Sequence, residues 1–182
     1  MLIKQFAEKK IYMQYEKNWN NGINIIQISI GLISLFIGGI VYIIARSPNQ
    51  TYFISKYLSN IYLFNSVPSA LRIIGNNLPE FIHPFSFILI TAGVMAFKNK
   101  RSYVFICLGW FLLNSIFEFG QKFSQMSLKL IPDWFEGIPF LENSRNYFLY
   151  GTFDILDLIA ILLGSIAAYY VLLLTSARRE RK

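Results

Sequence analysis

The sequence predicts an all-α fold, a polytopic membrane helical bundle with four transmembrane helices. Three observations indicate this class: 54% of the 182 residues are hydrophobic, 17% are aromatic, and the mean hydropathy is +0.43. Soluble domains of this size have lower values. Because each crossing uses about 20 residues and a connection, residues 1–182 are expected to form a single transmembrane domain.

Long apolar runs that end at polar or charged clusters define the four spans. The run 23–45 has no charge and, at about 1.5 Å per residue, is long enough to cross about 30 Å of hydrocarbon. The other spans are expected at about 78–97, 103–120 and 152–174. Cys107, the one cysteine, lies in the third run, so a disulfide or a cysteine-based zinc site within one chain is excluded and the thiol is interpreted as a packing residue.

Lysines and arginines cluster before the first span, between the second and third spans, and at the end of the chain. The positive-inside rule places these segments, and with them both termini, in the cytoplasm. Topology and contact with anionic membrane lipids then explain the net charge of +7. No base-reading or stacking element indicates a nucleic-acid partner.

The remaining segments are expected to lie at the membrane surface. Residues 1–22 are charged throughout and lack a cleavable signal, so they predict an amphipathic interfacial helix. The first outer connection, 46–77, is aromatic and apolar with a break at Ser66-Val67-Pro68, which favours two short interfacial helices. The second, 121–150, includes Trp134 and other aromatic residues suited to the interface.

The ionisable residues near the span ends are the candidate site. The topology sends His83, Glu118, Asp154 and Asp157 to the outer side. Charges inside helical spans cost about 2.5–3.5 kcal/mol each on insertion scales, so they favour positions facing a cavity or one another. The candidate ligand-binding residues are therefore those four together with Gln121.

Helical spacing groups these residues by face. Glu118 and Gln121 share a stripe with Asn114 if the third helix continues past Gly120. The two aspartates share a stripe with Gly164 and Ala168, small residues that let a neighbouring helix approach closely. Gly164 and Ala168 are thus predicted to be helix-packing residues below the acids.

Each acid also has a purely structural interpretation. Asp154, or Thr152 in its place, can cap the last span, and the helix macrodipole favours acids at that end. Glu118 can reach interfacial water from the rim of its span, and His83, before Pro84, can be an interfacial residue. Asp157 lies about 4.5 Å further along the axis than Asp154, where capping no longer explains it.

Three short motifs follow one another along the chain: LPEFIHPFSF around His83, EFGQ from Glu118 to Gln121, and GTFDILDLIAILLG from Gly151 to Gly164. Their order resembles that of VanZ-like membrane proteins, the family named for an accessory teichoplanin-resistance protein. The resemblance covers about residues 78–170. It implies a small polytopic protein of the bacterial cell envelope, located in the cytoplasmic (inner) membrane, and it supplies no reaction.

The chain departs from the family pattern at two positions. The family commonly has Arg where this chain has Gly151, and Asn where it has Ile161. Arg145 is a candidate replacement for the missing cation. The connection from Gln121 to Asp154 is also longer than the family's usual one.

Three functions from different classes follow. The favoured one is an accessory envelope protein whose outer-leaflet polar pocket binds a lipid-linked or amphiphilic molecule, such as an envelope precursor. A second is a structural or assembly subunit, as a homo-oligomer or within a larger membrane complex. A third is an enzyme acting on an envelope lipid, in which the carboxylates and His83 hold a divalent cation or transfer protons; no catalytic motif supports it.

Overall fold

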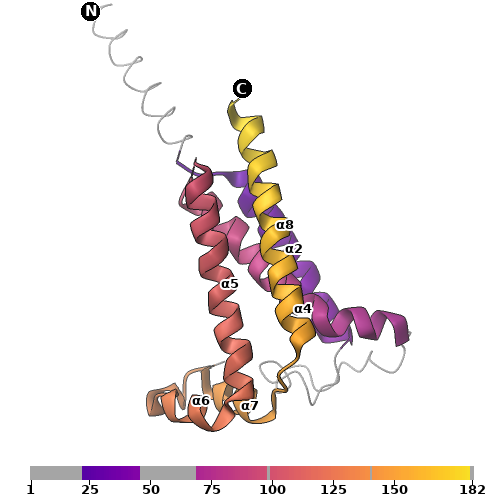
Figure 1. Ribbon diagram of the computed structural model, residues 1–182, viewed down its shortest axis with the longest axis vertical. Helices are drawn as coiled ribbons and strands as arrows, with labels where there is room; N and C mark the ends of the chain where they lie inside the picture. Colours follow the sequence, from indigo (N-terminus) through magenta and orange to yellow (C-terminus); the bar gives the residue numbers. More distant parts are fainter. Residues whose placement is uncertain (1–21, 46–68, 98, 140, 181–182) are drawn as a thin grey trace, which may run out of the picture.

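The regular elements of the computed structural model are helices, as predicted, throughout the residues that it describes: 22–45, 69–97, 99–139 and 141–180 (Figure 1). The long helices are α2 (Ile25–Ala45), α4 (Ser69–Val94), α5 (Lys100–Lys122) and α8 (Ile155–Glu180). Between α5 and α8 lie the short helices α6 (Ser124–Leu130), η3 (Asp133–Phe135), η4 (Leu141–Asn143) and α7 (Ser144–Tyr150). The predicted interfacial helix before α2 and the first part of the predicted connection, 46–68, lie outside the described residues. Residues 69–77, which follow the predicted break, form the start of α4 and not a separate short helix.

Within the described residues, three helices are long and apolar enough to cross a membrane: α2, α5 and α8, over Ile25–Ile44, Lys100–Lys122 and Ile155–Ser176. Most of their large apolar side chains are exposed, as is expected where lipid is the solvent. The first, third and fourth predicted spans are therefore confirmed as helices of membrane-spanning length and composition.

The predicted second span, 78–97, is not confirmed as a crossing. It forms part of α4, which begins at Ser69 and is not among the three apolar helices. The first half of α4 carries Arg72, Asn76, Asn77 and Glu80, whereas its second half has no Asp, Glu, Lys or Arg. Pro79 and Pro84 both lie inside the helix. Figure 1 shows the first part of α4 lying across the lower end of α8, while its second part runs up toward the start of α5.

Glycines join α2 and α4 as an antiparallel pair. The amide of Asn24 donates to the carbonyl oxygen of Gly93, 2.8 Å away, so α2 starts where α4 ends. A Cβ on Gly31 would lie 2.7 Å from Ile90 Cγ1, and one on Gly38 would lie 2.7 Å from Ile82 Cγ2. Close backbone approach at small residues is typical of helix pairs in membranes.

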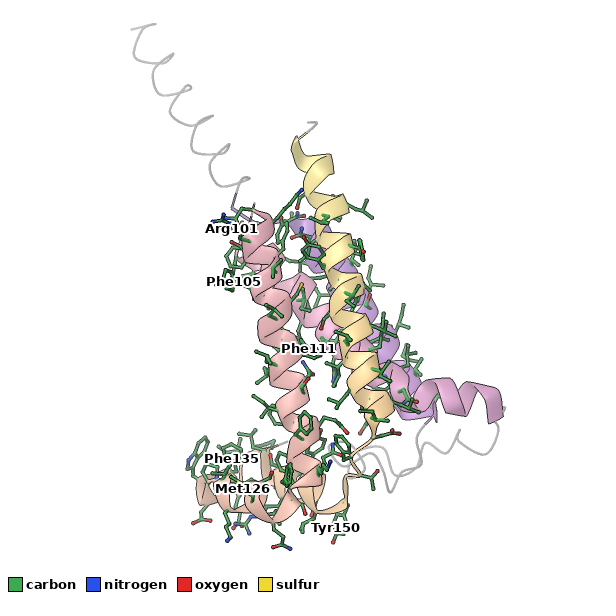
Figure 2. All side chains as sticks on the ribbon, viewed as in Figure 1. Arg101, Phe105, Phe111, Met126, Phe135 and Tyr150 are labelled. Atoms are coloured by element: carbon green, nitrogen blue, oxygen red, sulfur yellow. The ribbon has the colours of Figure 1, made fainter. Side chains whose placement is uncertain are left out.

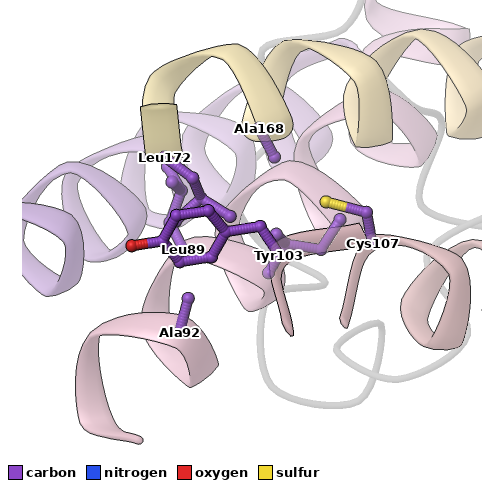
Figure 3. Close-up of a cluster of buried hydrophobic side chains, with 7 residues drawn as sticks. Leu89, Ala92, Tyr103, Cys107, Ala168 and Leu172 are labelled. Carbon is purple, nitrogen blue, oxygen red and sulfur yellow. The ribbon is translucent and has the colours of Figure 1, made fainter. Parts of the chain in front are cut away.

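The core lies where α4, α5 and α8 meet (Figure 3). Its buried members are Ile88, Leu89, Ala92, Tyr103, Cys107, Ala168 and Leu172. Cys107 is a free thiol within this core. Contacts at both ends fix the directions: α8 runs parallel to α4, since Asp157 meets Asn77 and Gly164 meets Phe81, and antiparallel to α5.

Polar groups tie the helices together at the end where α2 begins, which we call the Gln27 end. Gln27 Nε2 donates to Thr175 Oγ1 at 2.9 Å, linking α2 to α8. The hydroxyl of Tyr103 donates to the Phe97 carbonyl oxygen at 2.8 Å and lies against Ser176 Oγ. Helices in an apolar solvent gain modestly from such bonds, about 1 kcal/mol each.

The Gln27–Thr175 pair yields a test of this polar end. Gln27 is fully buried, and its Oε1 has no hydrogen-bond partner among the described residues. Thr175→Val removes the acceptor of Nε2, so we expect the free energy of unfolding in detergent to fall by about 1–3 kcal/mol. Gln27→Leu removes both amide groups, so we expect a neutral or stabilising effect. A larger loss in Gln27→Leu than in Thr175→Val would contradict this.

Candidate functional site

Four of the predicted site residues gather where α8 begins. The end of α5 supplies Glu118 and Gln121. Asp154 directly precedes α8, and Asp157 lies in its first turn. Asn77 of α4 joins them. We call these five residues the acidic junction.

Asp154 caps α8. It precedes the first helical residue, and its Oδ1 accepts a hydrogen bond of 2.9 Å from the amide of Leu156. Its carbonyl oxygen accepts from the amide of Asp157 at 3.2 Å. A side chain in this position satisfies an amide that has no partner within the helix. The structural interpretation of Asp154 thus has a direct basis in the structure.

Glu118 reaches the same helix start from α5. Its Oε1 accepts a hydrogen bond of 3.0 Å from the amide of Asp154, and the residue is only 3% exposed. In an ordinary capping box, a Glu or Gln in the third helical position bonds back to the amide of the cap residue. Here the third position holds Asp157, and a carboxylate from another helix takes over that bond.

Asp157 faces α4 instead. Asn77 Nδ2 donates to its Oδ1 at 2.8 Å. The start of α8 is therefore hydrogen-bonded to α5 through Glu118 and to α4 through Asp157. Sequence reasoning missed Asn77, because the residue lies one position before the expected span start at Leu78. Asn77 is four residues before Phe81, which faces α8, so helical spacing could have placed Asn77 on the same face.

Gln121 packs against Gly151. A Cβ on Gly151 would lie 2.7 Å from Gln121 Cδ and against the carbonyl oxygen of Tyr147. Position 151 is the one where the VanZ-like pattern has Arg, and a long side chain there would displace Gln121. The glycine therefore belongs to a local arrangement that has no room for that arginine.

Gly164 and Ala168 lie on the face of α8 that meets the other helices. The backbone of Gly164 approaches the carbonyl oxygen of Phe81, and a Cβ there would be 3.2 Å from Pro84 Cγ. Ala168 is fully buried in the core. Asp157 lies two turns before Gly164 on this face. The close approach of α4 and α8 at Gly164 therefore helps to bring Asn77 within hydrogen-bonding distance of Asp157.

His83 lies elsewhere on α4, with an exposed side chain. Its ring contacts the ring of Phe87, with centroids 6.0 Å apart, and Phe87 in turn stacks on Trp110 of α5 at 4.9 Å. His83 is thus placed one and a half turns beyond Asn77, in an aromatic row between α4 and α5.

Arg145 belongs to the segment between α5 and α8. It pairs with Asp133 and Glu136, at N–O distances of 3.4 and 3.7 Å, and all three side chains are largely exposed. The candidate replacement for the family's arginine thus binds the acids of its own segment.

The electrostatics of the acidic junction are those of a concentrated negative site. Three carboxylates lie at the start of one helix, where the macrodipole is equivalent to about half a positive charge. Within the described parts of the chain, no group of three His, Cys, Asp or Glu residues is arranged to hold a metal ion. Carboxylates attract an ammonium group and accept hydrogen bonds from hydroxyls, and they repel a bare phosphate.

Comparison of the chain with protein-family models, with curated proteins and with solved structures finds no match in any of the three.

Proposed function

We propose that the protein is a VanZ-like membrane protein of the bacterial cell envelope, whose acidic junction binds a lipid-linked or amphiphilic envelope molecule. The observation that carries the proposal is the Glu118 carboxylate, buried at the end of a membrane-length helix and bonded to the start of another beside two further acids. The EFGQ and GTFDILDL motifs of the resemblance meet at this point.

The number of acids supports a binding role. Asp154 Oδ1 is the usual side-chain cap of α8, and Glu118 Oε1 from another helix accepts a second amide at the same helix start. Glu118 and Asp157 add two further carboxylates at the same helix start. Ionisable groups in membrane proteins that exceed structural need are functional by default, because they are costly to keep.

A four-span arrangement completes the proposal, with α4 as the second crossing and both termini in the cytoplasm. Its support is that α5 begins and α8 ends at the same end, joined through Tyr103 and Ser176. Lys100 and Arg101 lie at that end, as the positive-inside rule requires of a cytoplasmic face. The acidic junction then lies at the outer leaflet of the inner membrane.

The ligand chemistry can be tested with a simple amphiphile. We expect dodecylammonium to raise the thermal stability of the purified protein in detergent, whereas dodecanol, its neutral counterpart, does not. A ligand at about 100 times its dissociation constant stabilises by about 2.7 kcal/mol. Glu118→Gln and Asp157→Asn should each weaken binding by about tenfold, or about 1.4 kcal/mol, without lowering the amount of folded protein.

Asp133→Asn is the matched control, because it removes an acid whose side chain is 97% exposed and pairs with Arg145 of its own segment. It should bind dodecylammonium like the unaltered protein. Equal binding by all four proteins contradicts the proposal. If Glu118→Gln and Asp157→Asn only lower the yield of folded protein, the acids are structural and the assembly-subunit function is favoured.

A further inference from the structure

The segment 123–150, from the end of α5 to the end of α7, forms a cap over that end of α5. Ser127 Oγ donates to the carbonyl oxygen of Gly120 at 2.9 Å. The ring of Phe148 lies against Gly120 and stacks on Phe117, with centroids 6.2 Å apart. Backbone and ring contacts therefore fix the cap to α5.

The cap runs across the axis of α5. Figure 1 shows α6 and α7 transverse to the lower end of α5, and Figure 2 shows Met126 and Phe135 on the arm that extends away from α8. If α5 crosses a membrane, as its length and composition allow, helices transverse to it lie parallel to the membrane plane.

Large apolar side chains of the cap are exposed. They are Phe123, Met126, Leu130, Trp134, Ile138, Leu149 and Tyr150. Leu130 is 74% and Trp134 64% exposed. Met126 and Leu130 are four residues apart in α6, so they share one face, and Ile116 and Phe119 are exposed on the adjoining end of α5.

The charges of the cap suit the boundary between headgroups and acyl chains. Arg145 pairs with Asp133 and Glu136, which lowers the cost of holding those acids near lipid. Lys122 lies over the ring of Phe153, 4.9 Å from its centroid, at the point where α5 ends. Long basic side chains and exposed Trp or Tyr are typical anchors at this depth.

We infer that the cap is a membrane-interface element: the exposed face with Met126, Leu130 and Trp134 lies in the lipid headgroup layer, about 5–10 Å into the boundary with the acyl chains. The inference concerns contact with bulk lipid and stands apart from the ligand of the acidic junction. Its partner is the bilayer surface, because large apolar side chains are exposed both on the transverse cap and on the adjoining end of α5, a helix of membrane-spanning length and composition.

Tryptophan fluorescence tests this depth. Trp19→Phe/Trp110→Phe leaves Trp134 as the one tryptophan of the chain, with a ring kept at position 110 for the stack on Phe87. In phosphatidylcholine–phosphatidylglycerol vesicles, we expect a blue-shifted emission. Lipids brominated near the headgroup should quench it more strongly than lipids brominated deep in the chain, and aqueous iodide should quench it little.

Leu112→Trp in a background of Trp19→Phe/Trp110→Phe/Trp134→Phe is the matched control, because Leu112 is exposed midway along α5. Its fluorescence should be quenched most by the deep bromines. A red-shifted Trp134 emission that iodide quenches, and that neither brominated lipid quenches, would overturn the inference. A blue-shifted Trp134 emission that neither iodide nor the brominated lipids quench would also overturn the inference, since a second copy or another protein then covers the cap.

Discussion

Gly164→Leu is expected to destabilise the protein by about 3 kcal/mol or more, at or above the upper end of the range for overpacked interiors. A Cβ at this position meets the carbonyl oxygen of Phe81, which is backbone and cannot rotate away as a side chain can. The change must therefore push α4 and α8 apart. Because Asn77–Asp157 lies two turns before this contact and the Ala168 core one turn after it, both should loosen.

Gly109→Leu on α5 is the matched control. It adds the same side chain to a membrane-length helix at a position with open space around it. Its effect should stay within about 0.5 kcal/mol. The measurement is the free energy of unfolding in a mixed-micelle titration. Equal losses in the two variants would show that the α4–α8 contact is not specific to Gly164.

The apolar helices could be predicted from the sequence because lipid imposes a simple rule. A segment without charge and long enough to cross must form a helix, since no water satisfies its backbone. This rule located α2, α5 and α8 to within a few residues, apart from the end of α8 at Glu180. The rule placed the start of α4 wrongly, at about residue 78, because proline and polar residues usually mark a boundary in the sequence. The helix in fact begins at Ser69 and continues through Pro79 and Pro84 with a bend.

The sequence predicted most of the residues of the acidic junction, but it did not predict the contacts between them. Helical spacing could place Glu118 beside Gln121 and Asp157 above Gly164, because those relations lie within single helices. It could not show that Glu118 bonds to the backbone of another helix, or that Asn77 meets Asp157. Such pairs depend on how α4, α5 and α8 dock, which is set by the small-residue contacts at Gly164 and Gly151.

The dual use of the acids links stability to the proposed function. Asp154 and Glu118 satisfy the start of α8, so their removal should cost stability even if no ligand binds. The conservative amides retain an acceptor oxygen while removing charge. Glu118→Gln therefore separates the two roles: capping survives, and attraction for an ammonium group is lost.

Asn77→Leu is expected to lower the free energy of unfolding by about 1.5–3 kcal/mol, the usual value of a hydrogen bond to a charged group. The change removes the Nδ2 donor that lies 2.8 Å from Asp157 Oδ1 and keeps a side chain of similar volume. Asp157→Leu removes the acceptor. If the bond accounts for both losses, the double variant Asn77→Leu/Asp157→Leu should be more stable than the sum of the single effects predicts.

The coupling energy from this cycle measures the pair directly, because residues in contact fail to be additive. The exposed pair Asp133–Arg145 gives the matched cycle within the same chain. Its coupling should be about 0.2–1 kcal/mol, since solvent screens it. A coupling between Asn77 and Asp157 no larger than that of Asp133 and Arg145 would mean that α4 does not hold the start of α8, and Asp157 would then be available to a ligand from the α4 side as well.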